Sequence, residues 1–279
     1  MMPGMCLWFV IQRMHFDKRA DVMRVRLKNG LSIQYGTRGM GQPVLLMHPV
    51  GLRGKFWRDV VAELENECRL VFPDFRGHGG SDAPPTPFTL SDLADDMAEI
   101  LKALVGPALV VGCSMGGMVA QAMAVRTPNL VSGVVIANTA HLRNDQGRAI
   151  MEQRAQTAEK GMPATLDTTL SRWFNAAYQL RHPEKVALMR DWLLEADPTV
   201  HAWSWRAIRD LAFADGLRQL KMPAMVIAGL DDQSTPVAAM KAMASDIPNA
   251  LYREIDSGHL APLEQPKQFA NCLREMLAQ

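Results

Sequence analysis

The stretch ALVVGCSMGGMVAQAMAVR, residues 108–126, decides the fold. Its first residues form a short apolar run typical of a buried strand, and its small residues after the serine are typical of a packed helix. Between them, Gly112-Cys113-Ser114-Met115-Gly116 fits the pattern G-x-S-x-G, in which a strained strand-to-helix turn exposes a serine hydroxyl. Side chains at positions 112 and 116 would collide with the neighbouring strand and helix, so glycine is expected at both. The alternative is an ordinary serine N-cap.

Short apolar runs alternate with helical patterns along most of the chain. Two alternating runs, residues 22–28 and 31–39, surround Asn29-Gly30 and predict a β-hairpin. Further strands are expected at residues 43–47, 68–72, 108–112, 130–137, 224–229 and 250–255, and helices at 56–64, 89–105, 114–126, 237–245 and 263–277. Because these later strands are continuously apolar and are joined by helices, they predict an α/β fold. Its sheet should be mostly parallel and twisted, with helices on both faces.

One long helical block interrupts this series. Residues from about 142 to 220 contain no convincing strand, and the strand–helix series resumes after them. This favours an inserted helical cap over a separate helical domain. We therefore expect a core at residues 22–140 and 216–279, a cap at residues 141–215, and an extension outside the fold at residues 1–21. A secretory signal is disfavoured, because the apolar run at residues 5–11 is short and no basic residue precedes it.

The composition excludes several classes of protein. With 48% hydrophobic residues, the chain is not expected to be disordered throughout. Lys and Arg total 30 against 29 Asp and Glu, so no bulk charge attracts nucleic acid or an anionic membrane. No apolar run reaches the ~18 residues of a membrane span. The four cysteines form no C-x-x-C pair, which excludes a zinc ribbon and favours a reducing, cytoplasmic setting.

A serine hydroxyl acts as a nucleophile at neutral pH only with a base and an orienting carboxylate. Asp231 and Asp232 follow the strand AMVIAG, and His259 follows the strand ALYREI. Because the carboxyl ends of parallel strands meet at one edge of a sheet, these side chains are candidates to join Ser114. The two aspartates are adjacent, so their side chains diverge and one of them is expected to reach the histidine. A histidine on a surface loop is the alternative reading of His259.

Acyl transfer also needs N–H groups that stabilise a developing oxyanion. The backbone N–H of Met115, directly after the serine, is the first candidate. The second should come from the loop His48-Pro49-Val50-Gly51, which follows an apolar strand. Pro49 has no N–H, so Val50 is the expected donor and Gly51 the reserve. A plain Pro-Gly turn is the alternative.

Five motifs together resemble the α/β-hydrolase superfamily. They are HPVG (48–51), DFRGHGGSD (74–82), GCSMGG (112–117), GLDDQSTP (229–236) and SGHLAPLEQP (257–266). The resemblance implies the α/β-hydrolase fold, with Ser114 as nucleophile and His259 as base. The family pattern G-x-x-D-x-x-x-P implies that Asp232 is the acid. The resemblance gives His78, in the second motif, a structural role.

A closer resemblance is to the 3-oxoadipate enol-lactonases. It is carried by GMVAQAMAVRTPNLVSGVVIANTA (117–140) and, in the cap, by Arg172-Trp173-Phe174. These enzymes hydrolyse a small enol-lactone that bears a carboxylate, in aromatic catabolism. The family has His-Gly where this chain has His48-Pro49, a departure that would reshape the acyl pocket. The departure concerns the identity of the substrate and leaves the chemistry unchanged.

The remaining expectations concern the substrate. Candidate substrate-binding residues are His48, Arg53, Arg143, Arg172 and Trp173; an arginine fork would bind a carboxylate, and solvated surface is the alternative for each arginine. Four of the six tryptophans fall in the cap, which favours a compact apolar roof over a small substrate. No metal or organic cofactor is required, and we expect a monomer or homodimer.

Several other activities share this scaffold. They are hydrolysis of another lactone or ester, carbon–carbon hydrolysis of ring-fission products, and a cofactor-free perhydrolase reaction. A ligand receptor is the non-enzymatic alternative, and the complete set of Ser114, Asp232 and His259 argues against it. A mere binder does not need all three.

Overall fold

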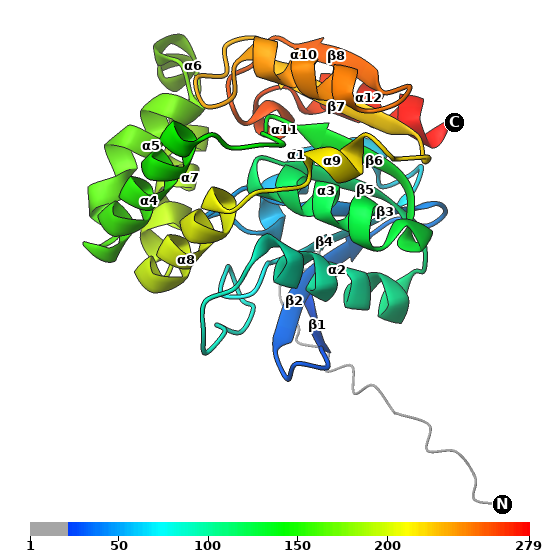
Figure 1. Ribbon diagram of the computed structural model, residues 1–279, viewed down its shortest axis with the longest axis horizontal. Coiled ribbons are helices and arrows are strands. Elements are labelled where there is room, and N and C mark those ends of the chain that lie inside the picture. Colours follow the sequence, from blue (N-terminus) through cyan, green and yellow to red (C-terminus); the bar gives the residue numbers. More distant parts are fainter. Residues whose placement is uncertain (1–21) are drawn as a thin grey trace, which may run out of the picture.

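A computed structural model describes residues 22–279, and the expected extension at residues 1–21 lies outside this described part (Figure 1). Its strands form one sheet in the order β1-β2-β4-β3-β5-β6-β7-β8. The strands are β1 (Val22–Arg26), β2 (Ser32–Arg38), β3 (Pro43–Met47), β4 (Arg69–Pro73), β5 (Ala108–Cys113), β6 (Val131–Ala137), β7 (Ala224–Gly229) and β8 (Leu251–Ile255). β1 and β2 form the predicted hairpin, β2 also pairs antiparallel with β4, and all other pairs are parallel. The mostly parallel sheet expected from the apolar runs is confirmed.

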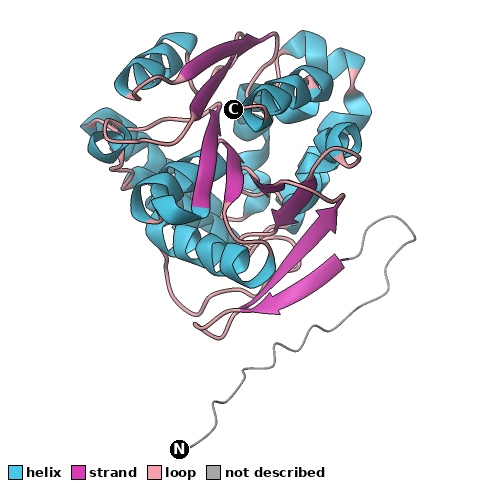
Figure 2. Ribbon diagram, turned by 90° about the vertical axis from the view of Figure 1, so that its right-hand side faces the viewer, coloured by secondary structure: helices cyan, strands magenta, loops and turns pink. Residues whose placement is uncertain are grey.

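Helices cover both faces of this sheet (Figure 2). Those of the core are η1 (Gly54–Trp57), α1 (Arg58–Leu64), α2 (Leu90–Leu104), α3 (Met115–Arg126), η2 (Pro128–Leu130), α9 (Ala214–Leu217), α10 (Val237–Asp246), α11 (Ala261–Glu264) and α12 (Pro266–Leu277). In β5, Ala108 and Val110 join the apolar cluster that contains α2 and α3, whereas Leu109 and Val111 join the cluster that contains α1 and α12. Alternate residues therefore face opposite helical layers, and this is why the strand is apolar throughout.

The helices between β6 and α9 gather at one side of the molecule, on the left in Figure 1. They are α4 (Asp145–Glu159), η3 (Met162–Thr165), α5 (Leu166–Trp173), α6 (Ala176–Arg181), α7 (Pro183–Glu195) and α8 (Pro198–Arg209). We call these helices the cap. The division into core and cap at residues 141–215 stays a prediction, and its second boundary falls within α9.

Two details of the helices follow from single residues. Thr89 caps α2, because its side chain accepts a hydrogen bond from the Asp92 N–H while the Asp92 carboxylate accepts one from the Thr89 N–H. The helix expected at residues 263–277 is instead two helices, α11 and α12. The break comes at Pro266, which lacks an N–H and therefore begins a helix more readily than it continues one.

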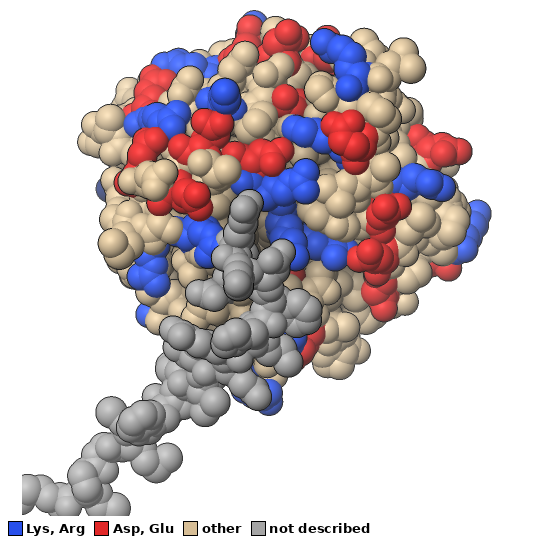
Figure 3. Space-filling model, turned by 180° about the vertical axis from the view of Figure 1, so that it is seen from behind, with Lys and Arg blue, Asp and Glu red and all other residues tan. Residues whose placement is uncertain are grey.

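The distribution of charged side chains on the surface agrees with the nearly equal numbers of basic and acidic residues. On the face shown in Figure 3, basic and acidic side chains are interspersed, without a large area of one sign. Within residues 22–279, no helix combines the length and the apolar character needed to cross a membrane.

Candidate active site

Ser114 occupies the turn between β5 and α3, with the strained backbone angles φ 55° and ψ −119°. A Cβ on Gly112 would lie 2.0 Å from the Gly116 carbonyl oxygen, and a Cβ on Gly116 would lie 2.1 Å from the Met47 carbonyl oxygen of β3. Both contacts are with backbone atoms, which yield less readily than side chains. The turn therefore requires glycine at both positions, for the reason expected from the sequence.

Three side chains from distant parts of the chain meet at this turn. The Ser114 hydroxyl lies 2.9 Å from Nε2 of His259, and Nδ1 of His259 lies 2.9 Å from Oδ2 of Asp232. All three residues are buried, with 9%, 4% and 6% of their surfaces exposed, respectively. A proton on Nδ1 donates to the carboxylate and leaves Nε2 as the acceptor for the serine O–H. The arrangement can therefore remove a proton from the serine.

The Asp232 carboxylate accepts several further hydrogen bonds. Its donors are the Thr235 hydroxyl at 2.6 Å, the N–H groups of Ser234 at 2.7 Å and Thr235 at 3.0 Å, and the Asn138 side-chain amide at 3.1 Å. Desolvation by burial acts to raise the pKa of Asp232. His259 and the hydrogen bonds from Thr235 and Asn138 outweigh this effect and lower the pKa to about 2. The carboxylate is therefore ionised at neutral pH.

Asp231 points elsewhere. Its carboxylate accepts a hydrogen bond from the Asn175 side chain of the cap at 2.9 Å, and its N–H donates to the Ser257 carbonyl. The side chains of adjacent aspartates diverge, as expected, and the one that reaches His259 is Asp232.

Two residues that the sequence argument did not single out hold the histidine loop in place. Glu264 accepts hydrogen bonds from the N–H groups of Gly258 at 2.9 Å and Leu260 at 3.3 Å, on either side of His259, and burial raises its pKa to about 7. Asn138 bonds both Asp232 and the Gly258 carbonyl. Asn138 directly follows β6 at the edge where the catalytic candidates gather, and Glu264 lies within the motif SGHLAPLEQP. The positions of Asn138 and Glu264 in the sequence could therefore have identified both as candidate residues of the site.

The loop after β3 is fastened by His48. Nδ1–H of His48 donates to the Pro49 carbonyl at 2.7 Å, and Nε2 accepts from the Phe75 N–H at 2.9 Å, so both ring nitrogens are engaged within the protein. Burial, with the neighbouring His78, lowers the pKa of His48 well below its usual value. A neutral ring suits this pair of bonds. Among residues 22–279, the N–H groups of Val50 and Met115 donate to no protein group, which leaves both able to bind an oxyanion.

The arginine and tryptophan candidates occupy different surroundings. Arg53 donates to Glu195 at 2.6 Å and lies over the Trp192 ring, so its charge is compensated. Arg143 and Arg172 have no acidic partner in the described part of the chain, and burial lowers the pKa of both. Trp173 is buried, and its carbonyl accepts the His259 N–H at 3.0 Å.

Arg154 of α4 is a further cation that the sequence argument missed. It too has no acidic partner in the described chain, and its guanidinium lies 4.8 Å from the centroid of the Trp205 ring. No group of three or more His, Cys, Asp or Glu side chains suited to a metal ion occurs among residues 22–279.

Comparison with protein families identifies the family to which this fold belongs. The family model for the alpha/beta hydrolase fold matches residues 42–266, which is most of the chain. This chain belongs to the α/β-hydrolase family. The family match agrees with the α/β-hydrolase resemblance stated from the sequence.

Individual relatives cover nearly the whole α/β hydrolase. The (E)-2-((N-methylformamido)methylene)succinate hydrolase of Acinetobacter baylyi is 27% identical over 91% of this chain and 97% of its own length. The 3-oxoadipate enol-lactonase 2 of the same organism is 26% identical over 88% of this chain and 93% of its own. The crystal structure of the enol-lactonase from Burkholderia xenovorans superposes with a TM-score of 0.86, at 28% identity, over 92% of this chain and all of that one. The resemblance to enol-lactonases is thus confirmed, and the chain is a hydrolase that acts on ester bonds.

Proposed function

We propose that this protein cleaves a small lactone or ester through an acyl-enzyme on Ser114. The observation that carries the proposal is the continuous hydrogen-bonded chain from Ser114 through His259 to Asp232. A receptor would need a pocket, but it would need neither a strained serine nor a base and a buried carboxylate in line with it.

In the proposed reaction, the substrate carbonyl oxygen lies between the N–H groups of Met115 and Val50. His259 takes the Ser114 proton as the serine oxygen attacks, and Asp232 keeps the imidazole in the required tautomer and stabilises its positive charge. The tetrahedral intermediate collapses to the acyl-enzyme, and the leaving oxygen takes the proton from His259. In a lactone the leaving enolate stays tethered to the acyl group. His259 then removes a proton from water, which attacks the acyl carbon. The second tetrahedral intermediate collapses, the Ser114 oxygen leaves and takes this proton back from His259, and the acid is released.

The substrate that we propose is a carboxylate-bearing enol-lactone, such as 3-oxoadipate enol-lactone in aromatic catabolism. The names of two relatives give substrates that carry carboxylates: one is a 3-oxoadipate enol-lactonase, and the other is a hydrolase whose substrate is a succinate. The cap also contributes arginines without acidic partners, Arg143 and Arg172, which suit an anionic substrate.

A turnover screen tests this function. Wild-type protein and Ser114→Ala are assayed against small lactones, p-nitrophenyl esters and vinylogous diketones from ring fission. We expect the wild type to hydrolyse lactones and esters, and Ser114→Ala to lose about 10³- to 10⁶-fold in turnover. A wild-type protein that is inert toward lactones and esters but cleaves the diketones would be a carbon–carbon hydrolase instead.

A further inference from the structure

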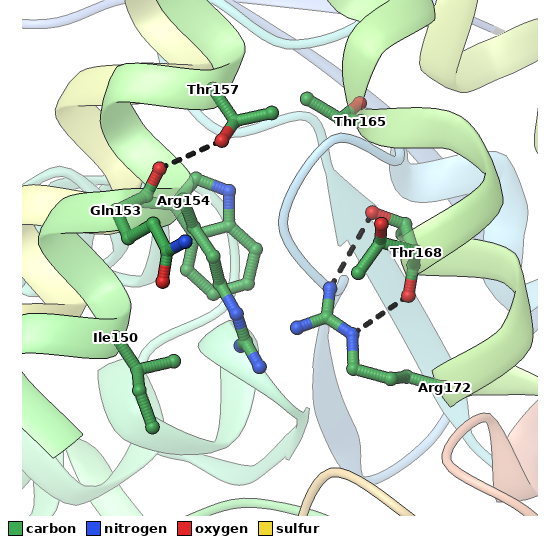
Figure 4. A pocket seen from close by; sticks show the side chains of 9 residues that line it. Ile150, Gln153, Arg154, Thr157, Thr165, Thr168 and Arg172 are labelled. Atoms are coloured by element: carbon green, nitrogen blue, oxygen red, sulfur yellow. Dashed lines mark hydrogen bonds between the residues drawn. The ribbon is translucent and has the colours of Figure 1, made fainter. Parts of the chain in front are cut away.

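A pocket of about 280 Å³ opens between α4 and α5 of the cap (Figure 4). Its lining contains no acidic residue; the residues are Ile150, Gln153, Arg154, Thr157, Thr165, Thr168, Thr169, Arg172 and Trp205. Figure 4 shows the guanidinium groups of Arg154 and Arg172 extending from opposite walls toward one another across the open centre. The pocket thus places two cations and several hydroxyl groups around one small space.

Neither arginine is neutralised by the protein. Arg172 donates from Nε to the Thr168 carbonyl at 2.9 Å and makes a long contact with the Thr169 hydroxyl at 3.5 Å, which holds its guanidinium in place. Arg154 lies against the Trp205 ring, and its one side-chain hydrogen bond in the described chain is a weak contact with the Met151 sulfur at 3.9 Å. Most of their N–H groups remain free to bind a ligand.

The acidic residues of α4 that lie near Arg154 in the sequence form ion pairs with another arginine. Glu152 and Glu159, on either side of Arg154, accept hydrogen bonds from Arg206 of α8 at 2.9 and 2.6 Å. Burial, followed by repulsion from Arg172 and Arg143, lowers the pKa of Arg154. Bringing like charges together in a partly buried hollow is unfavourable, and a bound anion would offset this cost.

Two chains of contact join the pocket to the catalytic loops. Arg172 directly precedes Trp173, whose carbonyl accepts the His259 N–H at 3.0 Å. On the opposite wall, Trp205 meets His201 edge to face, with 5.9 Å between ring centroids. His201 in turn packs against Gly51 of the oxyanion loop, where an added Cβ would lie 2.8 Å from its Cε1.

His201 is buried between the pocket wall and the oxyanion loop and does not itself line the pocket. It is only 1% exposed, and neither of its ring nitrogens has a hydrogen-bond partner within residues 22–279.

We propose that the pocket between α4 and α5 binds a carboxylate arm of the substrate, clamped between Arg154 and Arg172. The protein then selects anionic esters and lactones over neutral ones of the same shape. Thr157 and Thr165 already donate their hydroxyls to the carbonyls of Gln153 and Met162, which leaves the hydroxyls of Thr168 and Thr169 as additional donors to the carboxylate. The volume suits a short arm rather than a long acyl chain. This inference rests on the proposed hydrolysis at Ser114. It also assigns the acid-binding role to Arg154 and Arg172 in preference to Arg53, which already pairs with Glu195.

A matched pair of esters tests the proposal. Mono-p-nitrophenyl glutarate carries the carboxylate, and its methyl ester has the same length and leaving group without the charge. We expect the wild type to prefer the acid, and Arg154→Gln and Arg172→Gln each to lower kcat/KM for the acid about 10- to 100-fold. The ratio of kcat/KM for the acid to kcat/KM for the neutral ester should fall by a similar factor in each variant, and circular dichroism verifies that each variant is folded.

Arg148→Gln is the matched control. Arg148 lies on the same helix as Arg154 and loses the same charge, but it faces Asp210 at 3.6 Å and does not line the pocket. We expect its preference for the acid to equal that of the wild type. Equal losses on both esters in Arg154→Gln and Arg172→Gln, or a wild type that prefers the neutral ester, would overturn the proposal.

Inhibition by glutarate separates a substrate arm from a separate effector site. We expect glutarate to compete with the neutral ester in the wild type, and to lose this effect in the double variant Arg154→Gln/Arg172→Gln. Non-competitive inhibition, or inhibition that survives in the double variant, contradicts the proposal. A wild type that hydrolyses neither ester, or a Ser114→Ala variant as active as the wild type, would instead refute the proposed function itself.

Discussion

Replacing Asp232 with asparagine should reverse the polarity of its contact with His259. Oδ1 of Asp232 accepts the backbone N–H groups of Ser234 and Thr235, at 2.7 and 3.0 Å. An asparagine keeps its single oxygen at this position, and its NH₂ group then faces Nδ1 of His259. The NH₂ group lies at the shorter of the two contacts with Nδ1, 2.9 Å against 3.0 Å for Oδ1, and favours the tautomer with the proton on Nε2. That tautomer has no acceptor for the serine hydroxyl.

The magnitude follows from the loss of both the tautomer and the charge. The pKa of Asp232 is lowered from 3.8 to about 2. A shift of this size corresponds to a preference for the ionised carboxylate of about 2 kcal/mol. With the wrong tautomer added, we expect kcat to fall about 10³- to 10⁴-fold, the range found when the acid of a serine triad is changed in this way.

The assay is steady-state hydrolysis of a p-nitrophenyl ester, with circular dichroism to verify the fold of each variant. Asp231→Asn is the control, because it removes the same charge one residue away, where the carboxylate bonds only Asn175 among side chains. We expect its kcat to stay within about threefold of the wild type. A severe loss in Asp231→Asn together with a mild one in Asp232→Asn would show that the acid is wrongly assigned.

Three further predictions concern stability and pH. Gly116→Ala should lower the free energy of unfolding by about 3 kcal/mol in urea titrations, because its Cβ would meet the Met47 carbonyl at 2.1 Å; an unchanged midpoint would contradict this. The pKa of Glu264 is raised from 4.5 to about 7, so the folded protein binds more protons than the unfolded chain between these values. Stability should therefore fall as the pH rises through this window, and Glu264→Gln should remove that slope. The lowered pKa of Asp232 adds stability that is complete above pH 3.8 and is lost as the pH falls toward about 2. A melting series in acid should therefore show a smaller loss of stability in Asp232→Asn than in the wild type, and equal losses would contradict this.

The elbow and the positions of the strands along the chain could be predicted from the sequence because they depend on local constraints. A buried strand must be apolar on both faces, and the turn at Ser114 accepts only glycine at positions 112 and 116. Each of these requirements produces a sequence pattern within a few residues. No such local pattern distinguishes the two adjacent aspartates. The choice between them depended on the family pattern, since the contacts that decide it come from Asn138 and Asn175.

The cationic pocket could not be predicted, because it depends on which acids the cap arginines fail to reach. In the sequence, Arg154 stands between Glu152 and Glu159 and reads as a solvated helix charge. In the fold, α8 packs against α4, and Arg206 of α8 forms ion pairs with both glutamates. Arg154 is thereby left facing Arg172 across the pocket (Figure 4). A charge surplus of this kind arises only from tertiary packing.

The most direct test of the account is the site of covalent modification by a fluorophosphonate, read by mass spectrometry of the intact protein and its peptides. We expect one adduct per chain, on the peptide that contains Ser114, and no adduct in Ser114→Ala. A folded wild-type protein that stays unlabelled, or an adduct on another residue, would contradict the claim that Ser114, His259 and Asp232 form a working nucleophile.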